Sequence, residues 1–246
     1  MNLETEKLLP LEKQIDEMEI LDAISLMVKN NIDGIKVLES SKKEIFLAVN
    51  CIYKKLSQTN TGRLIYVGAG TSGRIGVQDG SELHPTFNWP LSRFDYVIAG
   101  GFEALTKSVE RAEDDIIEAK KIFKLKQISS KDVVIGLSAS SMTPFTSEFI
   151  KLSKRIGALT IGIGNNINGK LQKLSCIPIT LNTGREVIAG STRLKAGTSQ
   201  KVCLNIISSL VMVRFNKVKK GLMIDLVENN MKLKKRKKLI NNLIKT

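Results

Sequence analysis

Apolar side chains in the first quarter of the chain recur at the spacing of an α-helix. One series runs from Ile15 to Met27 and a second from Val37 to Ile52. The stretch from Asn30 to Gly34 between them is rich in residues that favour turns. We therefore predict that residues 11–56 form two helices with a break at 30–34.

From residue 64 onward, short apolar runs alternate with segments of helical periodicity. The predicted strands are 64–67, 96–99, 133–137, 159–163 and 177–181. The predicted helices are 72–80, 103–121, 144–155 and 192–215. This alternation predicts an α/β fold, in which helices cover both faces of a parallel sheet.

The turn after the first predicted strand is rich in glycine and hydroxyl groups. It contains Gly68-Ala-Gly70 followed by Thr71-Ser-Gly73 and then a helical pattern. A helix that begins here directs its unpaired amides and the positive end of its dipole at the turn, which favours anion binding. Glycine allows close approach of the backbone, and the two hydroxyls can donate hydrogen bonds. The sequence therefore predicts a phosphorylated ligand.

The same turn matches G-x-G-x-x-G, which by itself indicates a dinucleotide only weakly. The acidic residue expected about twenty residues later is not clearly present, because Asp95 instead opens the next strand. No Gly-Lys-Ser/Thr follows, so the turn is not a nucleoside triphosphate loop. A terminal phosphate monoester fits the hydroxyl pair better, and a turn without any ligand remains the alternative.

Two further turns of this kind follow later strands. They are Ala99-Gly-Gly101 and the hydroxyl-rich segment Ser138 to Thr143. Parallel α/β sheets bind ligands beyond the carboxyl ends of their strands, so we expect all three turns to line one cleft.

The composition predicts one main domain. At 246 residues and 42% hydrophobic content, the chain can bury a substantial core. No run approaches the ~20 apolar residues of a membrane span, and the first residues lack a signal pattern. Three scattered cysteines suggest buried thiols in a reducing compartment. We therefore expect a cytoplasmic protein. With one histidine and no C-x-x-C, we expect no zinc site.

Most of the net charge of +14 lies near the C-terminus. Residues 214–246 hold eleven Lys and Arg against two acids, which contributes +9. Such a tail can bind nucleic acid or an anionic membrane. Because it lacks interleaved aromatic residues and base-reading motifs, we interpret it as a solvated lysine-rich helix and expect neither partner.

Four segments together resemble the N-acetylmuramic acid 6-phosphate etherases. They are Arg63 to Glu82 with Pro85-Thr-Phe87, Ala99-Gly-Gly101 with Val109 to Asp114, Ser138-Ala-Ser140 with Thr143-Pro144, and Glu186 to Lys201. This family belongs to the sugar isomerase (SIS) superfamily, in which the glucokinase regulatory protein is a relative. The resemblance implies a three-layer αβα sandwich with a mostly parallel central sheet and a helical N-terminal segment. It suggests a helical segment 1–55, an SIS domain 56–220 and a basic helical tail 221–246.

The resemblance also implies the reaction. Family members cleave the D-lactyl ether of their substrate, giving N-acetylglucosamine 6-phosphate and D-lactate, in the recycling of cell-wall sugar. The C2 proton is removed, lactate leaves C3 and water then adds, so a base and an acid are needed and no cofactor or metal. By its position in the motif, Glu82 is the proton donor and Glu113 the probable C2 base.

The resemblance further implies contacts with the substrate or its phosphate. The residues concerned are Gly70, Thr71, Ser72, Gly73, Arg74, Ser138, Ser140, Thr143, Glu186, Ser191 and Lys195. It also implies a homodimer whose subunits complete each other's sites. Two apolar stripes could form its interface, one at Ile20, Ile24 and Met27 and the other at Ile206, Leu210 and Val213. For the second stripe a core position is slightly favoured.

The chain departs from the family pattern in two places. It has Ser141-Met142 where the family has Gly-Arg, so Ser141 has to accept the backbone conformation of that glycine. Relatives continue into a small helical subdomain, and residues 231–246 look like its shortened beginning. Two alternatives therefore stay open: a sugar-phosphate-binding regulator without turnover, and an isomerase or deaminase of amino-sugar phosphates on the same fold.

Overall fold

Five parallel strands form the central sheet of this computed structural model, which describes residues 3–10, 14–228 and 231–245. The strands are β1 (Leu64–Gly68), β2 (Phe94–Ile98), β3 (Val133–Ser138), β4 (Leu159–Gly164) and β5 (Ile177–Thr180). Their order across the sheet is β2-β1-β3-β4-β5. All five predicted strands are confirmed to within two residues at either end.

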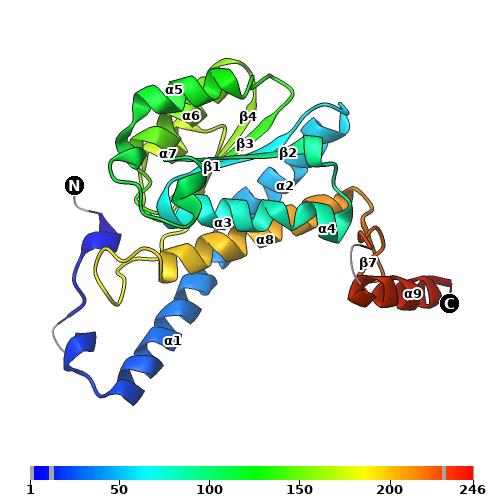
Figure 1. Cartoon of the computed structure of the whole chain (residues 1–246). Coiled ribbons are helices and arrows are strands. Elements are labelled where there is room, and N and C mark those ends of the chain that lie inside the picture. The colour runs from blue at the N-terminus through cyan, green and yellow to red at the C-terminus, as the bar shows by residue number, and fades with distance from the viewer. Residues whose placement is uncertain (1–2, 11–13, 229–230, 246) are drawn as a thin grey trace.

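Helices cover both faces of the sheet (Figure 1). One layer contains α2 (Lys42–Ser57), α3 (Gly70–Ser81) and α8 (Lys195–Arg214), and the other contains α5 (Ile116–Leu125), α6 (Pro144–Arg155) and α7 (Lys170–Leu174). Successive side chains of β1 point to opposite faces, so Leu64 and Tyr66 enter the first core and Ile65 and Val67 the second. The predicted three-layer αβα sandwich is confirmed.

The predicted break in the first helix is wrong. Helix α1 (Ile20–Lys36) runs through residues 30–34 without interruption and projects from the sandwich as an arm (Figure 1). Gly34 is not a helix breaker but a contact point, because a Cβ there would come within 2.3 Å of Lys195 Cγ on α8. The chain turns instead at Val37–Glu39, before α2 begins.

The predicted helix 103–121 is also wrong, since α5 begins only at Ile116. Before it lie two single 3-10 turns, Phe102–Leu105 and Ala112–Asp114, joined by irregular chain. Arg74 on α3 donates to the carbonyls of Ala104 (2.9 Å) and Lys107 (2.8 Å), which a continuous helix would need for its own hydrogen bonds. Asp115 then caps α5 by accepting from the amide of Glu118.

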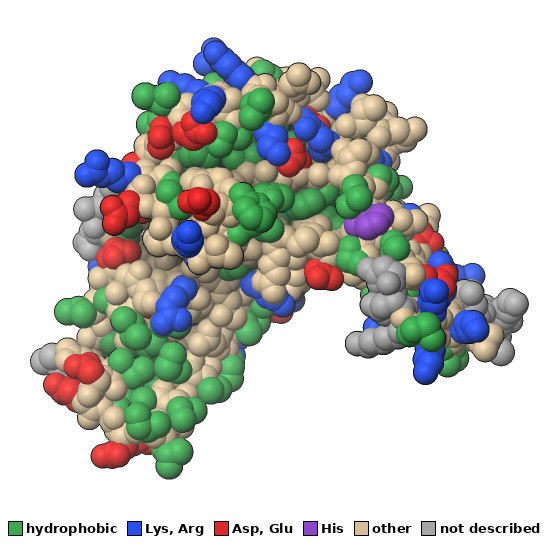
Figure 2. All heavy atoms as spheres, viewed as in Figure 1, with side chains coloured by type: hydrophobic (Ala, Val, Ile, Leu, Met, Phe, Trp, Pro, Cys, Tyr) green, Lys and Arg blue, Asp and Glu red, His purple; other side chains and the backbone are tan. Residues whose placement is uncertain are grey.

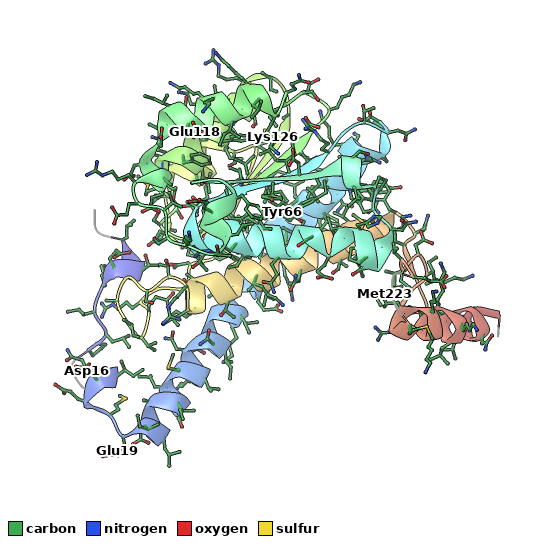
Figure 3. The ribbon with its side chains drawn as sticks, viewed as in Figure 1. Asp16, Glu19, Tyr66, Glu118, Lys126 and Met223 are labelled. Atoms are coloured by element: carbon green, nitrogen blue, oxygen red, sulfur yellow. The ribbon has the colours of Figure 1, made fainter. Side chains whose placement is uncertain are left out.

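A buried polar cluster joins β1 to α3 and α8. Tyr66 donates from β1 to Asp79 Oδ2 (3.0 Å), and Asn205 (2.6 Å) and Ser208 (3.1 Å) donate to Asp79 Oδ1. Tyr66 points from the sheet toward these helices (Figure 3). Burial raises the pKa of the Asp79 carboxyl, although the three donors act in the opposite direction.

The remaining α-helices and strands lie outside the five-stranded sheet. They are α4 (Leu83–Phe87), a small hairpin of β6 (Val218–Lys219) and β7 (Leu222–Met223), and α9 (Met231–Lys245), which lies within the predicted basic tail 221–246. Cys203 is buried but Cys176 is exposed, so the expectation of three buried thiols is wrong. None of the helices in the described ranges is long and apolar enough to cross a membrane.

Candidate active site

A cavity of about 490 Å³ opens beyond the carboxyl ends of β1 and β3. The chain order of the sheet reverses here, because β1 has β2 on one side and β3 on the other. Ligands of open α/β sheets bind at such a reversal. Two of the three predicted turns, 68–73 and 138–143, contribute to the wall of this cavity.

The first wall is the turn between β1 and α3. Gly70 has a φ of 51°, a left-handed conformation that favours glycine. Thr71 and Ser72 line the cavity, and no partner for either hydroxyl is present among the described side chains and backbone. The first amides of α3 also lack helical acceptors. This turn can therefore donate several hydrogen bonds to an anion.

A second helix begins at the opposite wall. Thr143 precedes α6, which starts with Pro144, and both residues line the cavity. The hydroxyls of Ser138 and Thr143 lie 2.7 Å apart, and those of Ser138 and Ser140 lie 3.2 Å apart. Ser138 is buried below the surface, so it orients the other two hydroxyls rather than lining the cavity. Two positive helix ends thus face one space.

Ser141 holds the loop beneath this wall. Its φ of 64° is left-handed, which confirms that it adopts a conformation suited to the family's glycine. Its fully buried hydroxyl donates to the carbonyl of Asn166 (3.2 Å) and accepts from the amide of Asn166 and from Gln172 Nε2, both at 3.1 Å. These bonds offset the cost of the left-handed backbone, which is about 1–2 kcal/mol.

Glu113 supplies a carboxylate to the same cavity. It lies in the 3-10 turn Ala112–Asp114 rather than in a helix, and Asp114 lines the cavity beside it. Glu113 also borders an adjacent hollow of about 310 Å³ that Arg74 lines. The guanidinium of Arg74 is bonded to two carbonyls of the segment that leads to Glu113, so in this structure it positions that segment.

Glu82 does not join Glu113 within one chain. It follows α3 ten residues after Ser72, which is about 15 Å along the helix at 1.5 Å per residue. There it lines a separate hollow of about 160 Å³ with Gln78 and Lys201, and its side chain is exposed. Within one chain, therefore, the two carboxylates do not line the same cavity.

The residues of the 186–201 segment mainly shape the site. The fully buried Glu186 caps α8 by accepting from the amides of Lys195 (3.0 Å) and Ala196 (2.8 Å), and burial raises its pKa. Lys195 Nζ donates to the carbonyl of Arg185, and burial lowers its pKa. Ser191 lies between Gly190 and Thr192, which do line the cavity. Glu186 and Lys195 therefore hold the loop that places Gly190 and Thr192.

Gly73 has a packing role. Its amide donates to the carbonyl of Ala69, and a Cβ at this position would come within 2.7 Å of Ile98. The absence of a side chain thus lets α3 begin close against β1 and β2.

Sequence reasoning missed part of the wall. Leu3, Glu6 and Thr192, none of them predicted to lie at the site, also line the cavity. Nothing in the sequence near Leu3 and Glu6 distinguishes them from an ordinary acidic segment, since they reach the site only through tertiary contacts. No cluster of three His, Cys, Asp or Glu suited to a metal ion occurs among the described residues.

Comparisons with known proteins agree with this geometry. A family model described as the N-terminal SIS domain of glucokinase regulatory protein matches residues 37–154. A Bacteroides fragilis protein described as a phosphosugar isomerase superposes with a TM-score of 0.63 at 18% identity, covering 82% of this chain and 95% of its own. The Vibrio vulnificus NanR protein, complexed with ManNAc-6P, gives 0.52 at 14% identity, over 91% and 69%.

Two curated relatives are much closer in sequence, and both are N-acetylmuramic acid 6-phosphate etherases. That of Clostridium acetobutylicum is 45% identical over 94% of this chain and 76% of its own length. That of Oceanobacillus iheyensis is 41% identical over 97% and 80%. Identity at this level over most of both chains, on an SIS-type fold, shows that the protein belongs to the N-acetylmuramic acid 6-phosphate etherase family.

Proposed function

We propose that the protein cleaves the D-lactyl ether of N-acetylmuramic acid 6-phosphate, releasing D-lactate and N-acetylglucosamine 6-phosphate. The observation that carries this proposal is the combination of two helix N-termini and a carboxylate around one cavity. Its free hydroxyls and helix amides suit a phosphate, and Glu113 suits proton transfer to or from a sugar. Family membership supports this choice of substrate, and a protein of the same fold is complexed with ManNAc-6P.

The phosphate binds between the two helix ends. Thr71 and Ser72 donate from one side, and Ser140 and Thr143 from the other. No Lys or Arg is among the described residues that line this cavity, so helix dipoles and hydroxyls supply the favourable electrostatics. The phosphate thereby fixes the sugar with its carbon chain extending toward Glu113.

Glu113 acts as the base on the open-chain form of the sugar. It removes the C2 proton, which the neighbouring aldehyde makes moderately acidic, and the electron pair moves to expel the lactate oxygen from C3. An alkoxide is a poor leaving group, so that oxygen needs a proton from a general acid. Water then adds at C3 of the unsaturated aldehyde, which restores the atom balance. Acid and base catalysis of this kind contribute about 10²–10⁴-fold each.

The acid is Glu82 of a second subunit. Within its own chain Glu82 lies about 15 Å from the phosphate turn, and its exposed carboxylate has no bonded partner among the described residues. A two-fold dimer can bring each Glu82 to the cavity of the other subunit, as the resemblance to the family implies. The site would then be complete only in the dimer.

Exposed apolar surface supports this assembly. Ile20 and Leu21 on α1 are 73% and 79% exposed, and the patch continues along the arm through Ile24 and Val28. Figure 2 shows hydrophobic side chains gathered on this arm. On α8, Leu210 and Val213 are also exposed, whereas Ile206 packs partly against the core, so the favoured core position is wrong for two of the three residues of the second stripe. Contiguous exposed apolar surface of this kind is typical of protein–protein interaction sites.

The test is incubation with N-acetylmuramic acid 6-phosphate and an enzymatic assay for D-lactate. We expect lactate release by the wild type and at least ~100-fold slower release by Glu113→Gln, with unchanged circular dichroism. Glu113→Gln should also abolish exchange of the C2 proton with solvent. Tight sugar-phosphate binding without lactate would point to a regulator. Conversion of an amino-sugar phosphate without lactate would point to an isomerase or deaminase.

A further inference from the structure

The first described residues of the chain dock against the cavity. The segment Leu3–Leu8 lies beside the loop that follows β5, as Figure 1 shows for the blue N-terminal and yellow segments. Thr5 is fully buried, and its carbonyl accepts from the amide of Gly190 (2.9 Å). Arg185 donates to the carbonyl of Leu8 (3.0 Å). The segment is therefore tied to the protein at Thr5 and at Leu8.

Asn166 connects Thr5 to the phosphate side of the site. Its Nδ2 donates to Thr5 Oγ1 (3.1 Å) and to the carbonyl of Ala139 (2.9 Å), which lies in the turn after β3. Its backbone amide donates to the hydroxyl of Ser141 (3.1 Å) in the same turn. All these groups are buried, so the bonds are shielded from water. One network thus fixes the N-terminal segment relative to the turn that precedes α6.

This docking places the carboxylate of Glu6 at the rim of the cavity. Glu6 lines the space that Thr71, Ser72 and Glu113 also line. The carboxylate lies against the backbone of Gly190, where an added Cβ would come within 2.8 Å of Glu6 Oε2. Glu6 is exposed, and its carboxylate makes no hydrogen bond or ion pair among the described residues, whereas Glu4 of the same segment pairs with Lys7.

We propose that Glu6 is a substrate-binding residue that selects the sugar part of the ligand. Its carboxylate accepts a hydrogen bond from a donor group of the sugar phosphate, an amide N–H or a hydroxyl, and the Thr5–Asn166–Ser141 network holds it in place. This inference rests on the proposed sugar-phosphate substrate.

Electrostatics explains why Glu6 favours a ligand with a sugar part over a bare phosphate ion. A carboxylate in a site built for phosphate repels a bare anion, and a carboxylate has only acceptors to offer. A sugar phosphate brings donors on its carbon chain while its phosphate remains at the helix ends, so the two negative groups are separated. Glu6 therefore favours phosphorylated sugars over small phosphate anions.

The experiment measures binding by titration calorimetry, with N-acetylglucosamine 6-phosphate and inorganic phosphate as probes. Glu6→Ala should raise the dissociation constant of the sugar phosphate roughly 10-fold to 100-fold, as expected for a hydrogen bond to a charged group. The dissociation constant of inorganic phosphate should stay unchanged or fall in the same variant. Glu6→Gln keeps an acceptor oxygen and should lose less affinity. Glu4→Ala, in the same segment, is the matched control and should bind both probes like the wild type.

Equal sugar-phosphate affinity of Glu6→Ala and wild type would overturn the assignment, and so would an equal loss for both probes. A loss of sugar affinity in Thr5→Val but not in Glu6→Ala would also overturn it, because the segment would then act without this carboxylate. D-lactate release by the wild type is measured in parallel. Selective weakening by Glu6→Ala without any lactate release would keep this inference and refute the etherase activity. A wild type that binds no sugar phosphate would refute both.

Discussion

Mixed dimers provide the sharpest test of how the two carboxylates act. Glu82→Gln and Glu113→Gln are each expected to lower turnover at least ~100-fold, because each removes one proton-transfer group. Within one chain, Glu113 lines the cavity together with Ser72, whereas Glu82 follows the far end of α3 and lines a separate hollow. If Glu82 serves the partner's cavity, the two inactive variants should complement each other.

The size of the recovery follows from counting sites. A mixed dimer of the two variants has one cavity with an intact Glu113 and an intact partner Glu82, and one cavity with neither. Random pairing of equal amounts makes half of the dimers mixed, so activity should return to about a quarter of the wild-type rate. A site built from a single chain predicts no recovery, since every subunit then carries one defect.

The assay co-expresses the two variants with different affinity tags, isolates the mixed species by tandem purification and measures D-lactate release. The purified mixed dimer should have about half of the wild-type rate per dimer. The reverse control pairs wild type with the double variant Glu82→Gln/Glu113→Gln. Shared sites predict that this mixed dimer is inactive, whereas single-chain sites predict about half of the wild-type rate. Mixed dimers of the two single variants that remain as slow as their parents would refute the shared site.

Three further results are expected. Ser72→Ala should raise the KM by roughly 10-fold to 100-fold through loss of a hydrogen bond to phosphate, and an unchanged KM would place the phosphate elsewhere. Arg74→Lys should lower kcat more than it raises the KM, because a lysine cannot hold the carbonyls of both Ala104 and Lys107 and so loosens the segment that carries Glu113. Steady-state kinetics, with circular dichroism as the folding control, would show this, and an unaltered kcat would contradict it. Asp79→Asn concerns stability against pH. Burial raises the pKa of Asp79, so the folded state holds its proton to higher pH than the unfolded chain, and stability is lost as pH rises from the ordinary value near ~3.9 through the raised one. Urea unfolding between these values should show Asp79→Asn gaining stability relative to wild type as pH rises, and a constant difference would refute the assignment.

The local pattern of the sequence determined the strands, the αβα layering and the glycine-rich turn Gly68–Gly73. Four consecutive apolar residues from Leu64 to Val67, followed at once by glycines, permit little besides a buried strand and a tight turn. Pro144 likewise marks the start of α6, since its missing amide is tolerated at a first helical position. The left-handed backbone of Ser141 could also be predicted, because the family has a glycine at this position.

Only the tertiary structure decided where the carboxylates lie. The segment before Glu113 has a helical apolar period, but Arg74 takes two of its carbonyls and prevents the helix. Glu82 belongs to the same motif as the glycine-rich turn Gly68–Gly73, yet a helix carries it away from that turn. Periodicity cannot report either effect, because each depends on how one element packs against another.

The N-terminal wall of the site shows the same limit most clearly. Thr5 and Asn166 are 161 residues apart in the chain, and their hydrogen bond brings Glu6 to the cavity. Sequence patterns describe neighbours within about one or two turns of a helix or along one strand. A contact between distant segments forms only when the whole sandwich has folded. Residues that act through such contacts therefore cannot be recognised from the sequence around them.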